Sequence, residues 1–193
     1  MRWNVHSRLE GQHAFLSASK HSWINYTDDE LVKSFYSYMA AKDGTKKHEL
    51  AALLISEKEP LPDIKRTLNM YVNDAIDFNM RPEQKLYYSD NAFGTADAIS
   101  FDEDRGYLRI HDLKTGVTPV TDKLGRLPQL EVYAAYFLLE YDYDLKETEI
   151  ELRVYQNDDI IIEHPYVDDI APIMDKIVYF DKLIEQIKRE ERN

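Results

Sequence analysis

The stretch LRIHDLKTG, residues 108–116, combines the alternation of a β-strand with two charged side chains on its apolar side. With a two-residue period, Leu108, Ile110, Asp112 and Lys114 share one face. An ionised carboxylate among core residues costs several kcal/mol unless it is paired or holds a metal ion. Asp112 therefore needs a compensating partner, and either the nearby lysine or a bound cation would provide one.

A second carboxylate, Asp97, occupies a similar position on the preceding predicted strand, where it shares a face with Ile99. The short polar turn at 102–106 predicts a hairpin, which would bring Asp97 close to Asp112. Two neighbouring carboxylates repel each other unless a proton or a cation lies between them, and oxygen ligands suit Mg²⁺ or Mn²⁺. Two acids, a cation and Lys114 form the minimal set for phosphodiester hydrolysis.

A structural alternative stays open for the same residues. Asp112 and Lys114 could form an ion pair at the end of a strand, and Asp97 could be an acid beside a turn. The pattern D-x-K alone occurs by chance in many proteins, so the elements and motifs around it must decide between the two interpretations.

The elements that would position these residues predict an α/β fold, with a mixed sheet between helices and the core order α-β-β-β-α-β. Expected helices cover about 45–58, 63–80, 129–141 and 168–190, and expected strands cover about 84–89, 94–101, 107–114, 148–156 and 159–164. Upstream, consecutive helices are expected, with Ser17 or Ser19 capping the first and Thr27 with Glu30 forming a capping box for the second. Residues 43–45, Asp-Gly-Thr, are expected to separate that second helix from the next.

Length and composition predict one domain over residues 1–193, with its core at about 43–156 and helical additions at 14–42 and 165–192. The chain has no cysteine, which excludes disulfides, thiolate metal sites and protein-ligated iron–sulfur clusters. No apolar run approaches the ~20 residues that cross a bilayer, and the N-terminal residues lack the apolar stretch of a signal peptide. We therefore expect a cytoplasmic protein that does not enter a membrane.

The net charge of −12 argues at first against a nucleic-acid partner. Residues 140–193 contain 16 of the 36 acidic and 7 of the 24 basic side chains, which leaves a net charge of only −3 upstream. A local basic path is therefore compatible with the sequence. The acidic C-terminal region also leaves open a homo-oligomer or a protein partner, because its apolar positions suit either the chain's own core or an interface: Ile170, Ile173, Met174, Ile177, Phe180 and Ile184.

Four motifs, in order, resemble the PD-(D/E)XK nucleases, in particular the branch that contains the RecB nuclease domain, lambda-type exonucleases and the CRISPR adaptation nucleases. GTAD at 94–97 is similar to the G-x-x-D strand of that branch, and DLKTG at 112–116 to its D-[apolar]-K-[TS]-G strand. Gln129 and Tyr133 match its Q-x-x-x-Y helix, and GTKKH at 44–48 matches the G-T-x-x-H helix opening of RecB-like members.

This resemblance covers roughly residues 43–140 and implies a restriction-endonuclease-like core with a divalent-metal site. The side-chain ligands of Mg²⁺ or Mn²⁺ would be His48, Asp97 and Asp112, with the carbonyl of Leu113 as a further ligand. Lys114 would be the catalytic lysine. The alternative for His48 is an ordinary helix histidine. No iron–sulfur cluster is expected, because the cysteines that hold one in many relatives are absent.

The same resemblance implies that Gln129 and Tyr133, one helical turn apart, line the cleft and position Lys114 or the DNA backbone. Alternatively, Gln129 is only an N-terminal helix residue and Tyr133 a core aromatic. Ala96 replaces the proline of the P-D pair, a common variation. Candidate phosphate contacts, which could equally be solvated surface side chains, are Lys42, Lys46, Lys47, Lys123 and Arg126.

The expected function is that of a Mg²⁺- or Mn²⁺-dependent DNA nuclease, an exonuclease of DNA recombination, replication or repair. The preference for an exonuclease rests on family analogy alone. A phage-encoded enzyme, acting in the cytoplasm of a bacterial host, is compatible with the short chain. Two alternatives stay open: a structure-specific or nicking endonuclease of the same fold, and a nuclease-like module that binds protein or DNA without chemistry.

Overall fold

The computed structural model describes residues 15–16 and 21–191, which belong to two compact units, Met1–Thr45 and Lys46–Asn193. The first unit contains a short 3₁₀ helix, His21–Asn25, and the beginning of helix α1, Asp28–Glu57. The proposed caps Ser17 and Ser19 lie outside the described residues. No helix in the described ranges is long and apolar enough to span a membrane. The predicted single domain, with its core at 43–156, stays a prediction.

Helix α1 is continuous, so the predicted break at residues 43–45 is wrong. A glycine inside a helix costs only about 1 kcal/mol relative to alanine. The Thr45 hydroxyl is also compatible with the helix, because it donates a hydrogen bond of 3.2 Å to the carbonyl of Ala41. The capping box at the start of α1 is confirmed. The backbone N–H of Thr27 donates to the Glu30 carboxylate at 2.8 Å, and that of Glu30 donates to the Thr27 hydroxyl at 3.3 Å.

The second unit is built on a five-stranded mixed sheet in the order β1-β2-β3-β4-β5. The strands are β1 (Arg81–Ser89), β2 (Ala92–Asp102), β3 (Tyr107–Leu113), β4 (Glu149–Gln156) and β5 (Asp159–Glu163). All neighbours are antiparallel except β3 and β4, which are parallel and are connected through helix α3 (Pro128–Tyr141). The predicted α/β fold and its core order are therefore confirmed, with further helices at both ends.

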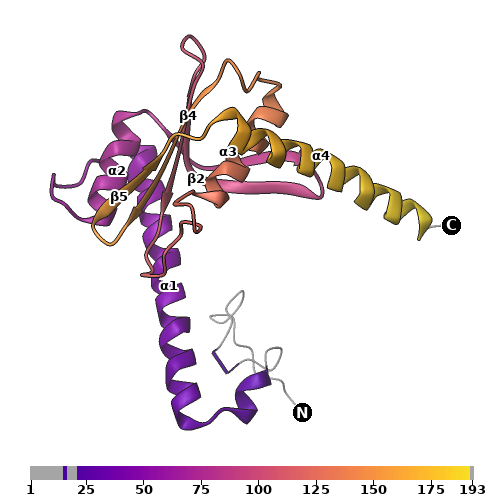
Figure 1. The fold of residues 1–193 in the computed structure, drawn as a ribbon. Helices are drawn as coiled ribbons and strands as arrows, with labels where there is room; N and C mark the ends of the chain where they lie inside the picture. The colour runs from indigo at the N-terminus through magenta and orange to yellow at the C-terminus, as the bar shows by residue number, and fades with distance from the viewer. Residues whose placement is uncertain (1–14, 17–20, 192–193) are drawn as a thin grey trace, which may run out of the picture. The chain divides into compact units, whose positions relative to one another are not determined.

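Helices cover both faces of this sheet, as Figure 1 shows. Helices α3 and α4 (Val167–Glu190) pack on the face that presents Leu108 and Ile110. Helix α2 (Thr67–Asp77) and the last turns of α1 cover the other face, which presents Leu113. Strand β3 is consequently covered on both sides. Even its polar residue His111 is fully buried. The strand that carries Asp112 is therefore buried at every position except Arg109, which is partly exposed.

Helix α4 divides the apolar positions of the acidic C-terminal region between core and solvent. Ile170 is fully buried, and Ile173 and Ile177 pack against the α3 face of the sheet. Phe180 and Ile184, farther along the helix, are 48% and 37% exposed. The first half of the helix thus belongs to the chain's own core, whereas a partner for the second half stays a prediction.

Candidate metal and catalytic site

The two predicted acids meet where strands β2 and β3 separate. The last residue pair of this ladder is Ala98 opposite His111, so Asp97 and Asp112 would form the next pair. Instead of a further backbone pair, the N–H of Leu113 donates to the Oδ2 atom of Asp97 at 2.9 Å. The Asp97 side chain therefore takes the place of a ladder acceptor and is fixed between the two strands.

Lys114, Asp112 and Gln129 form a closed group beside this point. The Lys114 ammonium lies 3.0 Å from Oδ1 and 2.9 Å from Oδ2 of Asp112, and it also donates to Oε1 of Gln129 at 2.9 Å. The Nε2 atom of Gln129 donates to Oδ1 of Asp112 at 3.3 Å. Asp112 lies on strand β3, Lys114 directly follows the end of that strand, and Gln129 lies in the first turn of α3. The structure thus brings these three predicted site residues together.

Asp112 is short of compensating positive charge despite its lysine. The residue is 2% exposed, and its Oδ2 atom is buried without a hydrogen bond of good geometry among the described residues. Burial, and then the charge of Asp97, raises the pKa of Asp112 to about 6, against the opposing effect of Lys114. A cation next to this carboxylate would relieve both effects.

A second group, His48, Glu83 and Asp97, offers one ligand atom each, and these atoms lie within 4.8 Å of one another. The Nδ1 atom of His48 is 3.3 Å from Oδ2 of Asp97, a contact that raises the pKa of His48. Burial and the charge of Asp97 raise the pKa of Glu83. Two carboxylates and one imidazole are a fitting donor set for Mg²⁺ or Mn²⁺. Asp112, expected as the third side-chain ligand, lies outside this group and contacts Lys114 instead.

Glu83 is the residue that reasoning from the sequence missed. In the β1–β2 register, Pro82 pairs with Ala98 and Gln84 with Ala96, so Glu83 faces Asp97. Glu83 also has a φ of +49°, a left-handed conformation that costs a residue with a side chain about 1–2 kcal/mol. Such strain persists where the surroundings impose it, and it is concentrated at functional sites. Counting back from the turn of the β1–β2 hairpin would have placed Gln84 opposite Asp97, because the register shifts by one residue between Tyr87 and Ser89.

The other residues of the expected cleft take simpler positions. Tyr133 packs against the core on the α3 face, and a Cβ atom on Gly94 would lie 2.7 Å from its ring, so the glycine makes room for the tyrosine. Within the described ranges, no hydrogen bond joins Tyr133 to Lys114. Leu113 reaches the site through its N–H, and the expected role of its carbonyl stays a prediction.

Arg126, a candidate phosphate contact, is engaged by acids of the protein itself. Its guanidinium donates two hydrogen bonds, of 2.7 and 2.6 Å, to Glu131, which is fully buried. Asp169 and Asp122 lie 3.4 and 4.0 Å away. This geometry favours a structural role for Arg126, since its strongest donors are already used.

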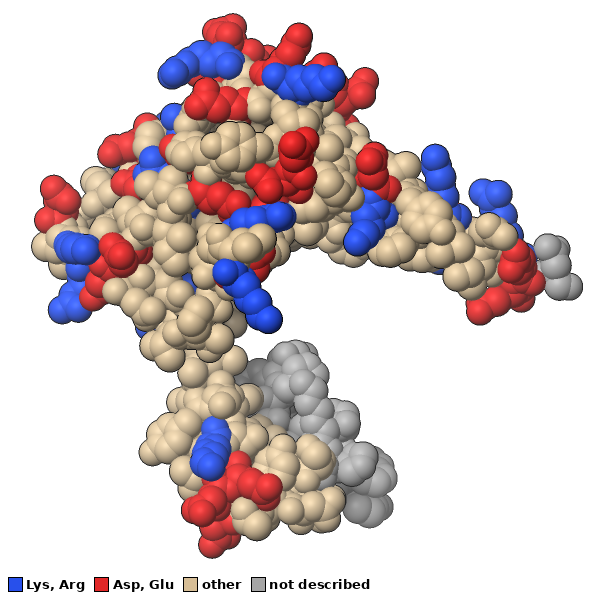
Figure 2. Space-filling model, in the orientation of Figure 1, with Lys and Arg blue, Asp and Glu red and all other residues tan. Residues whose placement is uncertain are grey.

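The remaining candidate phosphate contacts are exposed lysines. Lys46 and Lys47 lie on α1 close to His48, Lys123 lies in the loop between β3 and α3, and Lys42 belongs to the first unit. On the face of the molecule in Figure 2, lysine and arginine side chains are scattered among acidic ones and form no broad basic surface. This face therefore offers no extended basic surface to a nucleic acid.

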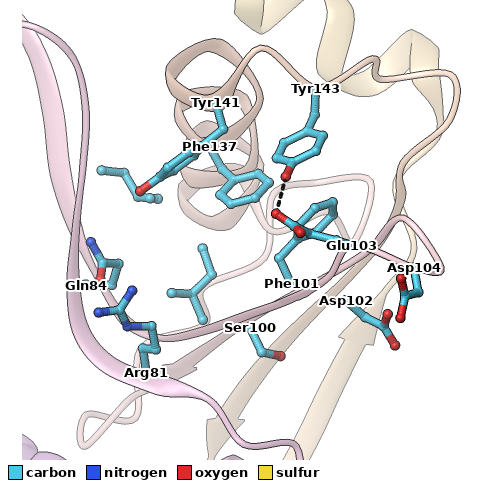
Figure 3. A pocket seen from close by; sticks show the side chains of 12 residues that line it. Arg81, Gln84, Ser100, Phe101, Asp102, Glu103, Asp104, Phe137, Tyr141 and Tyr143 are labelled. Atoms are coloured by element: carbon cyan, nitrogen blue, oxygen red, sulfur yellow. Dashed lines mark hydrogen bonds between the residues drawn. The ribbon is translucent and has the colours of Figure 1, made fainter.

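A cavity of about 560 Å³ opens elsewhere, between β1, β2 and the end of α3. Figure 3 shows its aromatic side, where Tyr143 donates a hydrogen bond of 2.8 Å to Glu103, and Arg81 on the opposite wall. None of the predicted metal or catalytic residues lines this cavity. It is therefore separate from the candidate site.

Comparisons with known proteins give a family but no function. A family profile described as "Protein of unknown function (DUF2800)" matches residues 63–163, just over half of the chain. That segment includes Glu83, Asp97, Asp112 and Gln129, whereas His48 precedes it. A search of curated proteins and a search of solved structures each found no match. On the strength of the profile match, the chain belongs to the DUF2800 family.

Proposed function

We propose that this protein is a Mg²⁺- or Mn²⁺-dependent nuclease that hydrolyses phosphodiester bonds in DNA, and that it acts as an exonuclease. The observation that carries the proposal is the proximity of two groups at the end of β3. One is the potential metal-binding group of His48, Glu83 and Asp97, and the other is the Lys114 ammonium held by Asp112 and Gln129. The resemblance to PD-(D/E)XK nucleases supports the same chemistry, and the exonuclease part of the proposal rests on that resemblance alone.

The side chains have separate tasks in this proposal. His48, Glu83 and Asp97 would hold the cation, which would neutralise charge on the phosphate and lower the pKa of the attacking water. Lys114 has hydrogens directed by Asp112 and Gln129, and its remaining donor would stabilise the charge that develops on a phosphate oxygen. Water adds to phosphorus, the bond from phosphorus to the leaving oxygen breaks, and that oxygen takes up a proton.

The test is hydrolysis of end-labelled linear DNA and covalently closed circular DNA with Mg²⁺, Mn²⁺ or EDTA. We expect linear DNA to be shortened from its ends with either metal, closed circles to survive, and EDTA to abolish the reaction. Asp97→Asn should be inactive, whereas the matched change Asp104→Asn, at an exposed acid in the β2–β3 turn, should not.

Absence of hydrolysis with both metals would overturn the proposal, as would equal activity of wild type and Asp97→Asn. Rapid cutting of closed circles would replace the exonuclease by an endonuclease of the same chemistry.

A further inference from the structure

Two apolar side chains project into solvent from the loop that joins β3 to α3. Val117 is 80% exposed and Leu124 is 81% exposed. Isolated exposed apolar residues are common on proteins and need no explanation. These two differ because their loop connects Lys114 with Gln129, both of which contact Asp112, and because buried polar side chains hold the loop on each side of them.

Val117 is held outward by a buried amide. Gln156, on β4, is only 6% exposed. Its Nε2 group donates to the carbonyl of Gly116 at 2.6 Å and to that of Thr118 at 2.9 Å. Because the two accepting carbonyls flank Val117, the backbone on both sides of this residue is fixed to the sheet while its side chain remains in solvent.

Leu124 stands on a second braced turn. The Asp122 side chain accepts hydrogen bonds from the backbone N–H groups of Leu124, at 2.8 Å, and Arg126, at 2.9 Å. The Arg126 guanidinium is in turn held by the fully buried Glu131. Leu124 therefore lies at the apex of a turn, and Arg126, two residues later, is anchored to a buried carboxylate.

The position and charge of the loop indicate what these tips would meet. Val117 is three residues beyond Lys114, so the two Cα atoms are at most about 11 Å apart. This tip is therefore within reach of the nucleotides that adjoin a phosphate at Lys114. Asp122 and Arg126 are engaged within the loop, whereas Lys123 has no ion pair in the part of the chain that the structure describes. Two apolar tips with one available ammonium complement the bases and phosphates of a nucleic acid.

We propose that Val117 and Leu124 pack against unstacked bases of the DNA strand whose phosphate is hydrolysed, and so hold a strand end in register with Lys114. Apolar side chains that contact or separate bases are a recurring device of DNA-binding proteins. This inference rests on the proposed nuclease function. It adds a substrate feature, a frayed or single-stranded end with bases available for contact.

The test is a double-mutant cycle between the protein and the substrate. The substrates are an end-labelled single-stranded oligonucleotide and its counterpart with abasic sites at the three terminal positions. Wild type should show a KM for the abasic strand about tenfold higher or more, the scale of one base contact. Val117→Ser combined with Leu124→Ser should raise the KM for the normal strand by a similar factor and remove the difference between the two strands.

Two controls separate this effect from general damage. Ile162→Ser removes an apolar side chain that is 49% exposed on β5, and it should keep the full difference between the strands. Val117→Leu retains an apolar side chain and should also keep the full difference in KM between the two strands. Thermal melts of all variants should match that of wild type.

An undiminished difference in the Val117→Ser/Leu124→Ser protein would overturn the inference and leave the nuclease proposal standing. A wild type that shortens linear duplex DNA but hydrolyses neither oligonucleotide would overturn the inference alone, and a wild type that hydrolyses no DNA with Mg²⁺ or Mn²⁺ would overturn both. The two failures are therefore distinguishable.

Discussion

Asp112 should make the stability of the metal-free protein fall as the pH rises from about 4 to about 6. In the folded protein its pKa is raised from 3.8 to about 6, chiefly by burial. A raised pKa means that the folded state binds the proton more tightly than the unfolded state. The resulting stability is fully present below about pH 4 and is lost as the pH passes through 6.

The magnitude follows from the shift. About two pKa units correspond to about 3 kcal/mol of unfolding free energy, which for a chain of this size is a fall of roughly 6–12 °C in Tm. A divalent cation at the neighbouring group should oppose this loss, because it stabilises the ionised carboxylates. Mn²⁺ at a hundred times its Kd would contribute about 2.7 kcal/mol. Its stabilising effect should therefore be small at pH 4 and larger at pH 7.

The assay is urea and thermal unfolding between pH 4 and pH 7, in EDTA and in Mn²⁺, for wild type, Asp112→Asn and Asp97→Asn. Asp112→Asn should flatten the decline in EDTA, while Asp97→Asn should lose the response to Mn²⁺. Glu163, whose pKa burial raises to about 7, adds a decline of the same sign in every variant, so only the difference from Asp112→Asn is diagnostic. The reasoning is refuted if wild type and Asp112→Asn have parallel pH profiles in EDTA.

Three further changes have expected outcomes. Lys114→Ala should lower the single-turnover rate by about two orders of magnitude or more. Lys114→Arg, which keeps the ion pair with Asp112, should recover thermal stability but not the rate. A wild-type rate in Lys114→Arg would show that only the charge matters. Glu83→Asn should weaken Mn²⁺ binding by at least about tenfold in titration calorimetry. It should also raise the unfolding free energy in EDTA by up to about 1 kcal/mol, because asparagine tolerates a positive φ. Unchanged Mn²⁺ affinity would exclude Glu83 as a ligand. Arg126→Ala should cost about 3–5 kcal/mol in urea unfolding, because it leaves Glu131 buried without its partner; a loss below about 1 kcal/mol would contradict the structural role.

The sheet and its helices could be predicted from local patterns. Strand β3 was recognisable from its two-residue period and α3 from a long apolar segment, and both lie within a few residues of their predicted bounds. Helix α2 was predicted too long at both ends, since it spans only Thr67–Asp77, and its late beginning has an identifiable cause. The reason is a contact that is distant in sequence, in which Asp158 of the β4–β5 turn accepts a hydrogen bond of 2.9 Å from the Thr67 N–H. A cap supplied from 91 residues away leaves no local signal.

The grouping of Asp112, Lys114 and Gln129 was accessible from spacing and motif, whereas two features of the site were not. The first is the engagement of Arg126 by Glu131, since nothing in the sequence shows that this glutamate is fully buried. Glu83 was overlooked because a left-handed residue interrupts the regular part of β1 and the predicted strand began after it. Its position depends on hairpin register, a property of two strands together.

The ion pair between Lys114 and Asp112 accounts for only part of a row of three carboxylates on β1, β2 and β3. Extending the two antiparallel registers places Glu83 opposite Asp97 and Asp97 opposite Asp112, on strands about 4.8 Å apart. An ion pair between Lys114 and Asp112 accounts for one of these acids, and it was the structural alternative from the outset. It accounts neither for Glu83, held at a φ of +49°, nor for Asp97, which displaces a backbone acceptor at the point where the ladder ends. Asp97 is held by the N–H of Leu113 and by His48, so the uncompensated cost in this row lies chiefly with Glu83, whose pKa is raised by burial and by the charge of Asp97. Strain and repulsion concentrated on one row, with an imidazole beside it, instead favour a site that a divalent cation completes.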